Sequence, residues 1–507
     1  MGTPREAWPK IAERQTCFRL KAKTCHPERK SASYGSLGYR KNGTCRERIL
    51  PARKSARHSP GVRVLILDCA TRTMTIGDMK PFEFYSVPRI IVERGGRHRL
   101  GELAASMGTR ALLIHNAPPL ADEMGGILRA SGLACQVFAQ HGEPTVQDVG
   151  AALAAAREAA SDVVIGLGGG SAIDLAKAVA ALLTNGGEVL DYMEVVGKGH
   201  KITRRSAPWI AVPTTAGTGA EATRNAVIGY KEKRFKASVR SELMLARIAL
   251  LDAEMQVTVS PAVTAASGCD ALCQVIESYT STAANPISDG LALEGIARAG
   301  RSLSRAYHTG TDLDAREDMA IVALLSGITL ANAGLGAVHG FAAPMGANFP
   351  VPHGVVCAAL LPHVIDANVR VLRAENVQHP TLRRYATIGR VLRTCPSSTV
   401  GNREMITSYS SPLGEVGRGL ASLTQTVVDV PALSGRADAG DVAAIDAAVA
   451  FVADLTRELA IPPLRNYGLT ESSIAPMVEL AKKASSMRSN PAILSDEILA
   501  EVLRRAI

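Results

Sequence analysis

Hydrophobic residues between positions 79 and 257 form short runs that are separated by stretches with helical spacing. Apolar runs typical of strands buried on both faces occur at 110–116, 135–140, 162–167 and 246–252. Ala-rich and Leu-rich stretches at 120–128 and 146–160 favour helices between them. Strands that alternate with helices in this way pair in parallel, and each helix crosses over the sheet. We therefore expect an α/β domain over residues 79–257.

From residue 258 to residue 507 the hydrophobic spacing is helical almost throughout. Helices are expected at 261–280, 286–307, 315–333, 353–374, 381–393, 441–460 and 470–484. A last helix follows Ser495, a suitable N-cap, with Asp496 and Glu497 in the first turn, where the helix dipole favours acidic groups. The sequence thus predicts an all-α second domain over residues 258–507.

Two segments lack these patterns. Residues 1–78 mix basic residues with Ser, Gly and Cys and hold few large apolar groups, so they bury too little surface to offset the entropy of ordering. We expect a disordered basic extension, and the alternatives are a transit peptide and a nucleic-acid-binding arm. Residues 395–440 are rich in Ser, Gly and Thr, and we expect them to be an insertion, either an ordered flap or a mobile loop.

The positive charge of the chain belongs to its first segment. The formal net charge is +10, and residues 1–60 alone carry fifteen Lys or Arg against four Glu. The rest of the chain is therefore close to neutral, which gives no reason to expect nucleic-acid binding by the folded body. A nucleic-acid-binding protein that acts through the basic segment stays open as an alternative.

The cysteines and one long apolar run bear on the cellular compartment. Nine cysteines, none of them in a C-x-x-C pair, fit a reduced cytoplasmic chain better than a disulfide framework. No Asp, Glu, Lys or Arg occurs between Asp318 and Asp366, and this run is long enough to span a bilayer. Because the run contains His and Asn residues and several Gly and Pro, we expect buried core and no membrane association.

The turn after the run at 162–167 is the candidate nucleotide-binding loop. Gly168, Gly169 and Gly170, followed by Ser171, stand between an expected strand and an expected helix. Glycines at such a place let backbone N–H groups approach a pyrophosphate at the positive end of the helix. Glycine-rich turns also occur for packing alone, so the motif by itself leaves both interpretations open.

Four polar side chains in apolar surroundings form the candidate metal site. Asp270 and Gln274 are four residues apart, so they share one face of the helix expected there. His339 and His353 lie within the uncharged run. A carboxylate, an amide and two imidazoles offered from apolar surroundings are suitable ligands for a divalent cation.

These four residues belong to a longer pattern. The stretch G-C-D-A-L-C-Q-V-I-E, followed by H-G-F-A-A-P-M-G and P-H-G, resembles the metal signature of the iron-containing (group III) alcohol dehydrogenases. The resemblance implies an α/β dinucleotide-binding domain with a parallel sheet and an all-α C-terminal domain, an arrangement shared with dehydroquinate synthase. It implies that Asp270, His339 and His353 bind the metal and act in catalysis. The chain departs from the pattern at Gln274, where the family has a ligand His, and at Ala343, where many members have a His that relays protons.

The resemblance extends to the cofactor segments. G-G-G-S-x-x-D-x-x-K and P-T-T-A-G-T-G-A-E resemble two dinucleotide loops of the family, and two later positions keep its spacing near the nicotinamide ribose. The residues implied in cofactor binding are Gly168, Gly169, Gly170, Ser171, Asp174, Thr214, Thr215, Thr218, Asn225 and Lys236. Asn116 stands where NAD-preferring members carry an Asp that repels a 2′-phosphate. A neutral amide neither repels that phosphate nor attracts it as an Arg would. We expect NAD and leave NADP open.

The resemblance implies a homodimeric oxidoreductase that transfers hydride between NAD(P) and a small alcohol, aldehyde or ketone. A divalent metal, Fe or Zn, would polarise the substrate oxygen. For Gln274 three outcomes stay open: a weak fourth ligand, a site completed by water, or a site without metal in which the amide binds substrate. The last of these corresponds to a metal-independent NAD(P)H-dependent keto-acid reductase of the same fold. Cys269 and Cys273, on either side of Asp270, are expected to be small core residues.

Overall fold

The computed structural model describes residues 81–233, 235–395 and 439–507. The expectations for the basic extension over residues 1–78 and for nearly all of the insertion over residues 395–440 lie outside this part of the chain. The described residues belong to one compact unit.

A parallel sheet of six strands forms the first half of the described chain. Its strands are β1 (Arg89–Val92), β2 (Arg110–His115), β3 (Ala134–Ala139), β4 (Val163–Gly168), β5 (Trp209–Pro213) and β8 (Ile248–Leu251). Their order across the sheet is β1-β8-β5-β4-β2-β3, and every neighbouring pair is parallel. The four runs predicted as strands therefore are strands of one parallel sheet.

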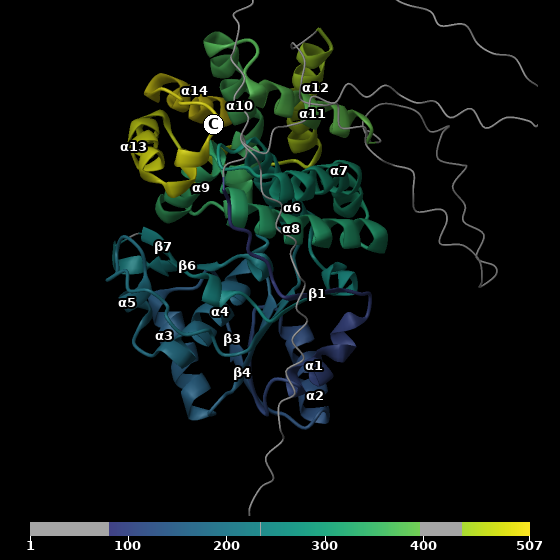
Figure 1. The fold of residues 1–507 in the computed structure, drawn as a ribbon, viewed down its shortest axis with the longest axis vertical. Coiled ribbons are helices and arrows are strands. Elements are labelled where there is room, and N and C mark those ends of the chain that lie inside the picture. The colour runs from purple at the N-terminus through teal and green to yellow at the C-terminus, as the bar shows by residue number, and fades with distance from the viewer. Residues whose placement is uncertain (1–80, 234, 396–438) are drawn as a thin grey trace, which may run out of the picture. The chain divides into compact units, whose positions relative to one another are not determined.

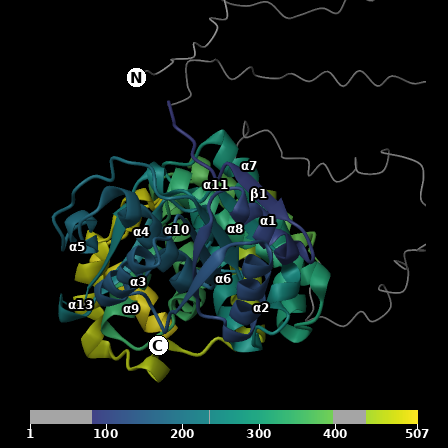
Figure 2. The same cartoon turned by 90° about the horizontal axis from the view of Figure 1, so that it is seen from below.

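Helices cover both faces of this sheet (Figures 1 and 2). The covering helices are α1 (Leu100–Ala105), α2 (Pro118–Ala130), α3 (Val146–Glu158) and α4 (Gly170–Asn185). Along β2, Leu112 and Ile114 pack into the cluster that contains α3 and α4, while Ala111 and Leu113 pack into the cluster that contains α1 and α2. Successive strand residues point to opposite faces, which explains why β2 is apolar at four consecutive positions, Ala111 to Ile114.

An antiparallel hairpin, which the sequence did not predict, lies beside the sheet. It consists of β6 (Asn225–Tyr230) and β7 (Phe235–Arg240), and β6 contacts α4. Its strands carry Lys, Arg and Gly among their apolar residues, so the alternation is too weak to stand out from the surrounding loops. The short helix α5 (Val189–Tyr192) precedes it in the chain.

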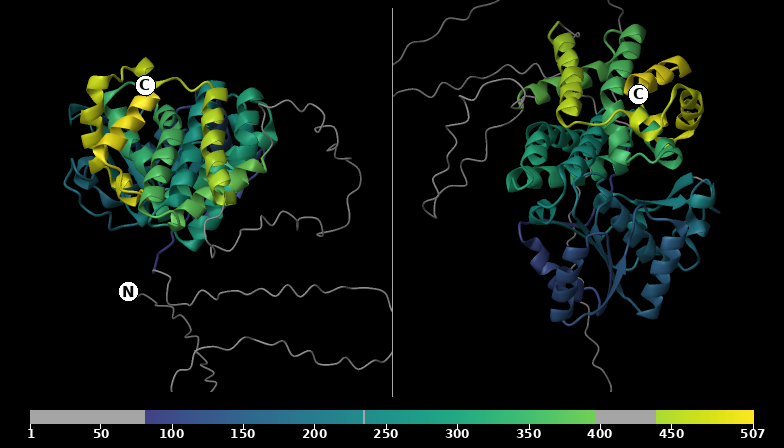
Figure 3. Two further views of the ribbon diagram at one scale, coloured as in Figure 1. Left: turned by 90° about the horizontal axis from the view of Figure 1, so that it is seen from above. Right: turned by 180° about the vertical axis from the view of Figure 1, so that it is seen from behind.

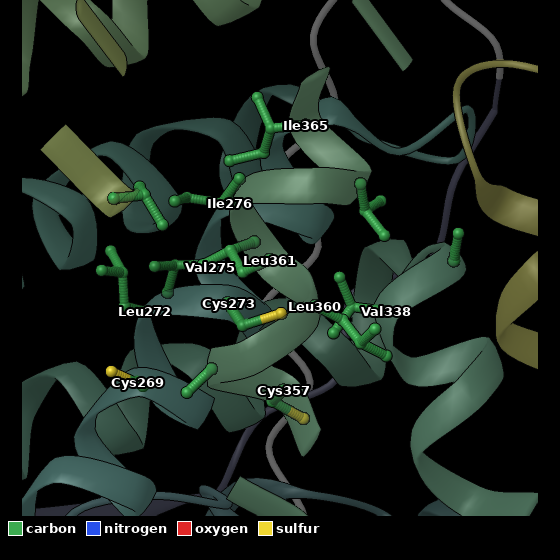
Figure 4. Packing of buried hydrophobic residues seen from close by; sticks show 14 of the residues in the cluster. Cys269, Leu272, Cys273, Val275, Ile276, Val338, Cys357, Leu360, Leu361 and Ile365 are labelled. Carbon is green, nitrogen blue, oxygen red and sulfur yellow. The ribbon is translucent and has the colours of Figure 1, made fainter. Parts of the chain in front are cut away.

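The second half of the described chain is helical, as predicted (Figure 3). Its helices are α6 (Pro261–Thr280), α7 (Pro286–His308), α8 (Leu313–Ala333), α9 (Ala337–Asn348), α10 (His353–Glu375), α11 (Pro380–Arg393), α12 (Ala439–Glu458), α13 (Glu471–Lys483) and α14 (Asp496–Ala506). Leu, Val, Ile, Ala and Cys side chains of α6, α9 and α10 pack into one core, part of which Figure 4 shows. The fold class predicted from the sequence, a parallel α/β unit followed by a helical unit, is confirmed.

Helix α9 was not predicted. It begins after Gly334 and Gly336, contains Pro344, and has no N-cap side chain of its own, so its sequence lacks the usual start signals.

Within the described residues, α10 is long and apolar enough to cross a membrane, and the bent pair α8 and α9 passes the same test together. Of the apolar window of α10, 72% is buried inside the protein.

Candidate functional site

Helix α6 places Asp270 and Gln274 in the core of the helical part. The helix starts at Pro261, and the Ser260 side chain accepts a hydrogen bond from the Val263 N–H at 3.3 Å. Asp270, in the middle of the helix, is only 1% exposed, and Gln274 follows one turn further on the same face. Both side chains therefore lie where a charge or an amide needs a partner.

His339 of α9 and His353 of α10 meet at Asp270. The Nε2 atoms of His339 and His353 lie 3.2 Å and 3.7 Å from Asp270 Oδ1. The centroids of the two imidazole rings are 5.4 Å apart. His353 is the first residue of its helix and its side chain is 37% exposed, whereas His339 is buried. The structure thus brings the three predicted residues together, and solvent reaches the cluster beside His353.

Glu277 fixes the orientation of His339. Its Oε1 accepts the Val338 N–H at 2.8 Å, which satisfies a free N–H group at the start of α9. Its Oε2 lies 2.7 Å from His339 Nδ1, so Nδ1 donates its hydrogen to Glu277 and Nε2 faces Asp270, where its lone pair becomes available to a cation once its own proton is lost. A carboxylate behind a ligating histidine is a common support for a metal site. Glu277 ends the motif that begins at Gly268, but the sequence alone predicted no role for it.

Two buried oxygen atoms at this cluster point to a cation. Asp270 Oδ2 and Gln274 Oε1 have no hydrogen-bond partner among the residues that the structure describes. Such atoms are costly unless a cation or a ligand satisfies them. One potential ligand atom from each of Asp270, His339, His353 and Cys357 lies within 4.8 Å of the others. This donor set fits a divalent metal, and Cys357 is a member that the sequence analysis missed.

The electrostatics of the metal-free cluster fit the same picture. Burial raises the pKa of Asp270, but the two imidazoles, His353 first and then His339, outweigh it and lower the pKa to about 2. Burial lowers the pKa of His353, although Asp270 opposes this effect. The carboxylate of Asp270 therefore stays ionised beside His353, whose imidazole favours the neutral form. The pKa of His339 is instead raised well above its ordinary value, because burial, which lowers it, is outweighed by Cys357, Asp270 and Glu277.

The glycine loop lies at the point where the strand order reverses. From β2 the chain moves outward to β3, and from β4 it moves the opposite way to β5 and β8. Ligands of open parallel sheets bind at the carboxyl ends of the strands at such a switch point. Asn116 follows β2, Gly168 ends β4 and Thr214 follows β5, so the predicted cofactor residues share this edge.

Side chains that follow β2 and β5 lie so close to the glycine loop that larger residues there would collide with them. Gly168 has a φ of +144°, and a Cβ there would lie 1.9 Å from Asn116 Oδ1. A Cβ on Gly170 would lie 2.6 Å from Thr218 Oγ1, and one on Gly169 would lie 3.2 Å from Thr215 Oγ1. Helix α4 begins at Gly170 with no side-chain cap, so its first N–H groups are available to an anion.

Three other predicted cofactor residues lie around α4 and the hairpin. Asp174 accepts hydrogen bonds from the Val227 N–H at 3.0 Å and from Lys177 Nζ at 3.2 Å. The buried ammonium of Lys177 also donates to the Asn225 carbonyl at 2.6 Å. These contacts tie α4 to β6, so the carboxylate of Asp174 has partners within the chain. Ser171, in the first turn of α4, is half-buried.

Lys236 lies at the boundary between the hairpin and the metal cluster. Its Nζ is 2.5 Å from Glu143 Oε2 and would be 2.9 Å from a Cβ on Gly346 of α9. Lys236 and Glu143 both act on the pKa of His353, which places this ion pair near the exposed side of the cluster. The predicted cofactor residue Lys236 is therefore close to the predicted metal ligands.

Fold and site together define a class of protein with two parts: a nucleotide-binding sheet with a glycine loop at its switch point, and helices that gather a metal-ligand cluster. Comparison with known proteins gives the family. Residues 88–253 match the family model described as iron-containing alcohol dehydrogenase, and residues 264–507 match that of the C-terminal domain of the same family. The chain belongs to the iron-containing alcohol dehydrogenase family, as its motifs predicted.

Relatives and solved structures agree with this assignment. The chain is 42% identical over 232 residues to alcohol dehydrogenase 4 of Saccharomyces cerevisiae, an alignment that covers 46% of this chain and 60% of the yeast protein. It is 34% identical over 305 residues to choline dehydrogenase of Bacillus subtilis, which covers 59% of this chain and 76% of that protein. The crystal structure of 1,3-propanediol oxidoreductase aligns over 84% of this chain and 100% of its own, with a TM-score of 0.70 and 28% identity.

Proposed function

We propose that this protein is an NAD(P)-dependent alcohol dehydrogenase or carbonyl reductase that uses a divalent metal bound by Asp270, His339 and His353. One observation carries the proposal: the three side chains meet around Asp270 Oδ1, and a second oxygen of the same carboxylate has no partner among the described residues. Family membership supports it, because the matched models describe alcohol dehydrogenases with iron.

Each group in the cluster has a distinct task. The cluster would hold a divalent cation, which when bound would supply Lewis-acid polarisation of the substrate oxygen. Asp270 and the two imidazoles would supply the ligands, and Glu277 keeps Nε2 of His339 directed toward the cluster. The apolar core around α6, α9 and α10 keeps bulk water away from all but the His353 side, which strengthens electrostatic interactions inside the site.

The dinucleotide would bind across the edge formed by Asn116, Gly168–Gly170 and Thr214–Thr218. The N–H groups at the start of α4 suit a pyrophosphate, and the nicotinamide half would reach toward Lys236 and the metal cluster. When bound, the nicotinamide supplies or accepts the hydride. We propose NAD as the cofactor. NADP is proposed as a second one, because Asn116 carries no charge to repel a 2′-phosphate.

The substrate would be a small alcohol, aldehyde or ketone. Relatives named alcohol dehydrogenase and 1,3-propanediol dehydrogenase support this class. We further propose a homodimer in the cytoplasm, with no nucleic-acid or membrane partner. The five cysteines that the structure describes are free, which suits a reducing compartment.

The test is oxidation of NADH and NADPH by purified protein with short aldehydes and ketones, before and after treatment with a chelator. We expect activity that the chelator abolishes and that added Zn²⁺ or Fe²⁺ restores, and we expect Asp270→Asn to be inactive under all conditions. Metal-free protein that retains full activity, above all with keto acids, would contradict the proposal and favour the metal-independent keto-acid reductase.

A further inference from the structure

The donor set of this chain departs from the family pattern on α6 and includes a thiol on α10. Gln274 replaces an imidazole on α6, one turn after Asp270. On α10 a thiol, Cys357, follows His353 by the same interval of four residues. Side chains four residues apart share one helix face. Each helix therefore offers the cluster a pair of donors, and the pair on α10 includes sulfur.

The geometry places the Cys357 sulfur among the predicted ligands. Its Sγ lies 3.7 Å from His339 Nε2, the same nitrogen that faces Asp270. The side chain is buried, and Figure 4 shows its sulfur within the core formed by α6 and α10. Asp270 Oδ2 and Gln274 Oε1 have no hydrogen-bond partner among the described residues, and both side chains are at most 2% exposed.

Cys273 is the competing sulfur. Its Sγ lies 3.9 Å from His339 Nδ1, and it groups with Glu277 and His339. That face of the imidazole is already occupied, because Nδ1 donates to Glu277 Oε2 at 2.7 Å. A cation bound on that side would have to displace this hydrogen. Cys357 lies beside Nε2, the nitrogen that Glu277 leaves for a cation, whereas Cys273 lies beside Nδ1.

We propose that Cys357 is a metal ligand that takes the place of the missing imidazole, giving a site of one carboxylate, two imidazoles and one thiolate. This inference rests on the proposed metal-dependent function. Binding breaks the S–H bond, releases the proton to solvent and forms a sulfur–metal bond, so metal affinity is coupled to pH. A thiolate shifts the preference of the site toward zinc and cobalt. The side beside His353 is left for the substrate oxygen.

The test is the absorption spectrum of the full-length protein loaded with Co²⁺. Bound Co²⁺ reports any site through weak visible bands and reports a thiolate ligand through a strong near-ultraviolet charge-transfer band. We expect both in the unaltered protein. Cys357→Ser should lose the charge-transfer band, whereas Cys269→Ser should keep it, because Cys269 is a buried cysteine of α6 outside both ligand clusters.

The outcomes separate this inference from the function on which it rests. Visible bands without a charge-transfer band would overturn the thiolate ligand and leave the metal site intact. A charge-transfer band lost in Cys273→Ser but kept in Cys357→Ser would assign the sulfur to the other side of His339, which also overturns the inference. The absence of every cobalt band would overturn both the inference and the metal-dependent function.

A rescue variant guards against misfolding of Cys357→Ser. The double variant Gln274→His/Cys357→Ser restores an imidazole in place of the thiolate. We expect Cys357→Ser to bind Co²⁺ roughly tenfold or more weakly than the unaltered protein, as loss of one donor implies. The double variant should recover most of that affinity and show visible bands without the charge-transfer band. A double variant that retains the charge-transfer band would contradict the inference.

Discussion

At the scale of single residues, two buried carboxylates outside the proposed set of metal ligands are central to this protein. Glu277 uses one oxygen to hold the first turn of α9 and the other to hold His339. Glu221, in the loop before the hairpin, is 3% exposed, and its Oε1 has no hydrogen-bond partner among the described residues. Both oxygens of Glu277 therefore have partners, whereas one oxygen of Glu221 lacks a partner among the described residues. Replacing each side chain gives a test.

Replacing Glu277 with Gln should weaken metal binding without unfolding the protein. The amide oxygen can still accept the Val338 N–H, but the neutral group no longer stabilises the Nδ1 hydrogen of His339 or raises the basicity of Nε2. Loss of such a support typically lowers metal affinity by about 10- to 100-fold. A competition titration with a zinc indicator measures the change. Unchanged affinity would show that Glu277 serves only to start α9.

Replacing Glu221 with Gln should remove a pH dependence of stability. Burial raises the pKa of Glu221 from 4.5 to about 7, against the opposing effect of Lys177. Because the folded state holds the proton more tightly, the stability that this group gives is complete below pH 4.5 and is lost as the pH rises to about 7. The loss amounts to about 3 kcal/mol. Urea unfolding of both proteins across this range should show the variant gaining relative to the unaltered protein as the pH rises; parallel curves would exclude the effect.

The residues of the site divide by the kind of signal that they leave in the sequence. Asp270, His339 and His353 could be predicted because charged or ionisable groups stand out in an apolar run. Cys357 could not, because a thiol among Val, Ala and Leu has the pattern of a core residue. Glu277 could not be predicted either, because its partners belong to α9, which is distant in the sequence.

At the scale of elements, the junction between β4 and α4 shapes the proposed cofactor site. The chain turns there through three glycines packed against Asn116, Thr215 and Thr218, which come from other strand ends. The boundaries of α6 were predicted closely because Ser260 and Pro261 are strong start signals. Helix α9 was missed because tertiary partners, Asn490 and Glu277 at its start, replace local signals. The hairpin of β6 and β7 was missed because its strands alternate too weakly.

Gly168→Ala should abolish dinucleotide binding. Its φ of +144° disfavours any side chain, and the added Cβ would lie 1.9 Å from Asn116 Oδ1. Either the loop or Asn116 must move, which disturbs the edge that receives the pyrophosphate. Gly150→Ala in α3 is the matched control, because nothing lies within 4 Å of its added Cβ and helix propensity rises. Quenching of protein fluorescence by NADH measures both; equal affinity in the two variants would contradict the assignment of this loop.

At the scale of the whole described unit, α8 joins the two halves of the site. The backbone of Gly219, in the second cofactor loop, packs against Gly327 of α8, and Ser326 Oγ donates to the Gly217 carbonyl at 3.3 Å. On the other side of the site, Lys236 of β7 lies beside α9 and near His353. The sheet edge and the metal cluster are thereby held next to each other by direct contacts.

Gly327→Ala should destabilise the protein and weaken NADH binding together. The added Cβ would lie 2.1 Å from the Gly219 carbonyl oxygen, a backbone atom that cannot yield without moving the loop. Overpacking of this kind costs about 1–3 kcal/mol. Gly290→Ala in α7, with nothing within 4 Å of its Cβ, is the control. Thermal unfolding and NADH titration measure the two effects. A variant that lost stability but bound NADH normally would show that this contact does not position the loop.

The most direct test of the account is anomalous X-ray diffraction from crystals of the protein grown with Zn²⁺ and NAD⁺. The account predicts an anomalous peak bonded to Asp270, His339 and His353, with the pyrophosphate of the dinucleotide at Gly168–Gly170 and the nicotinamide facing the metal. A fully loaded crystal with no peak among these three side chains, or with the dinucleotide bound away from this edge of the sheet, would contradict it.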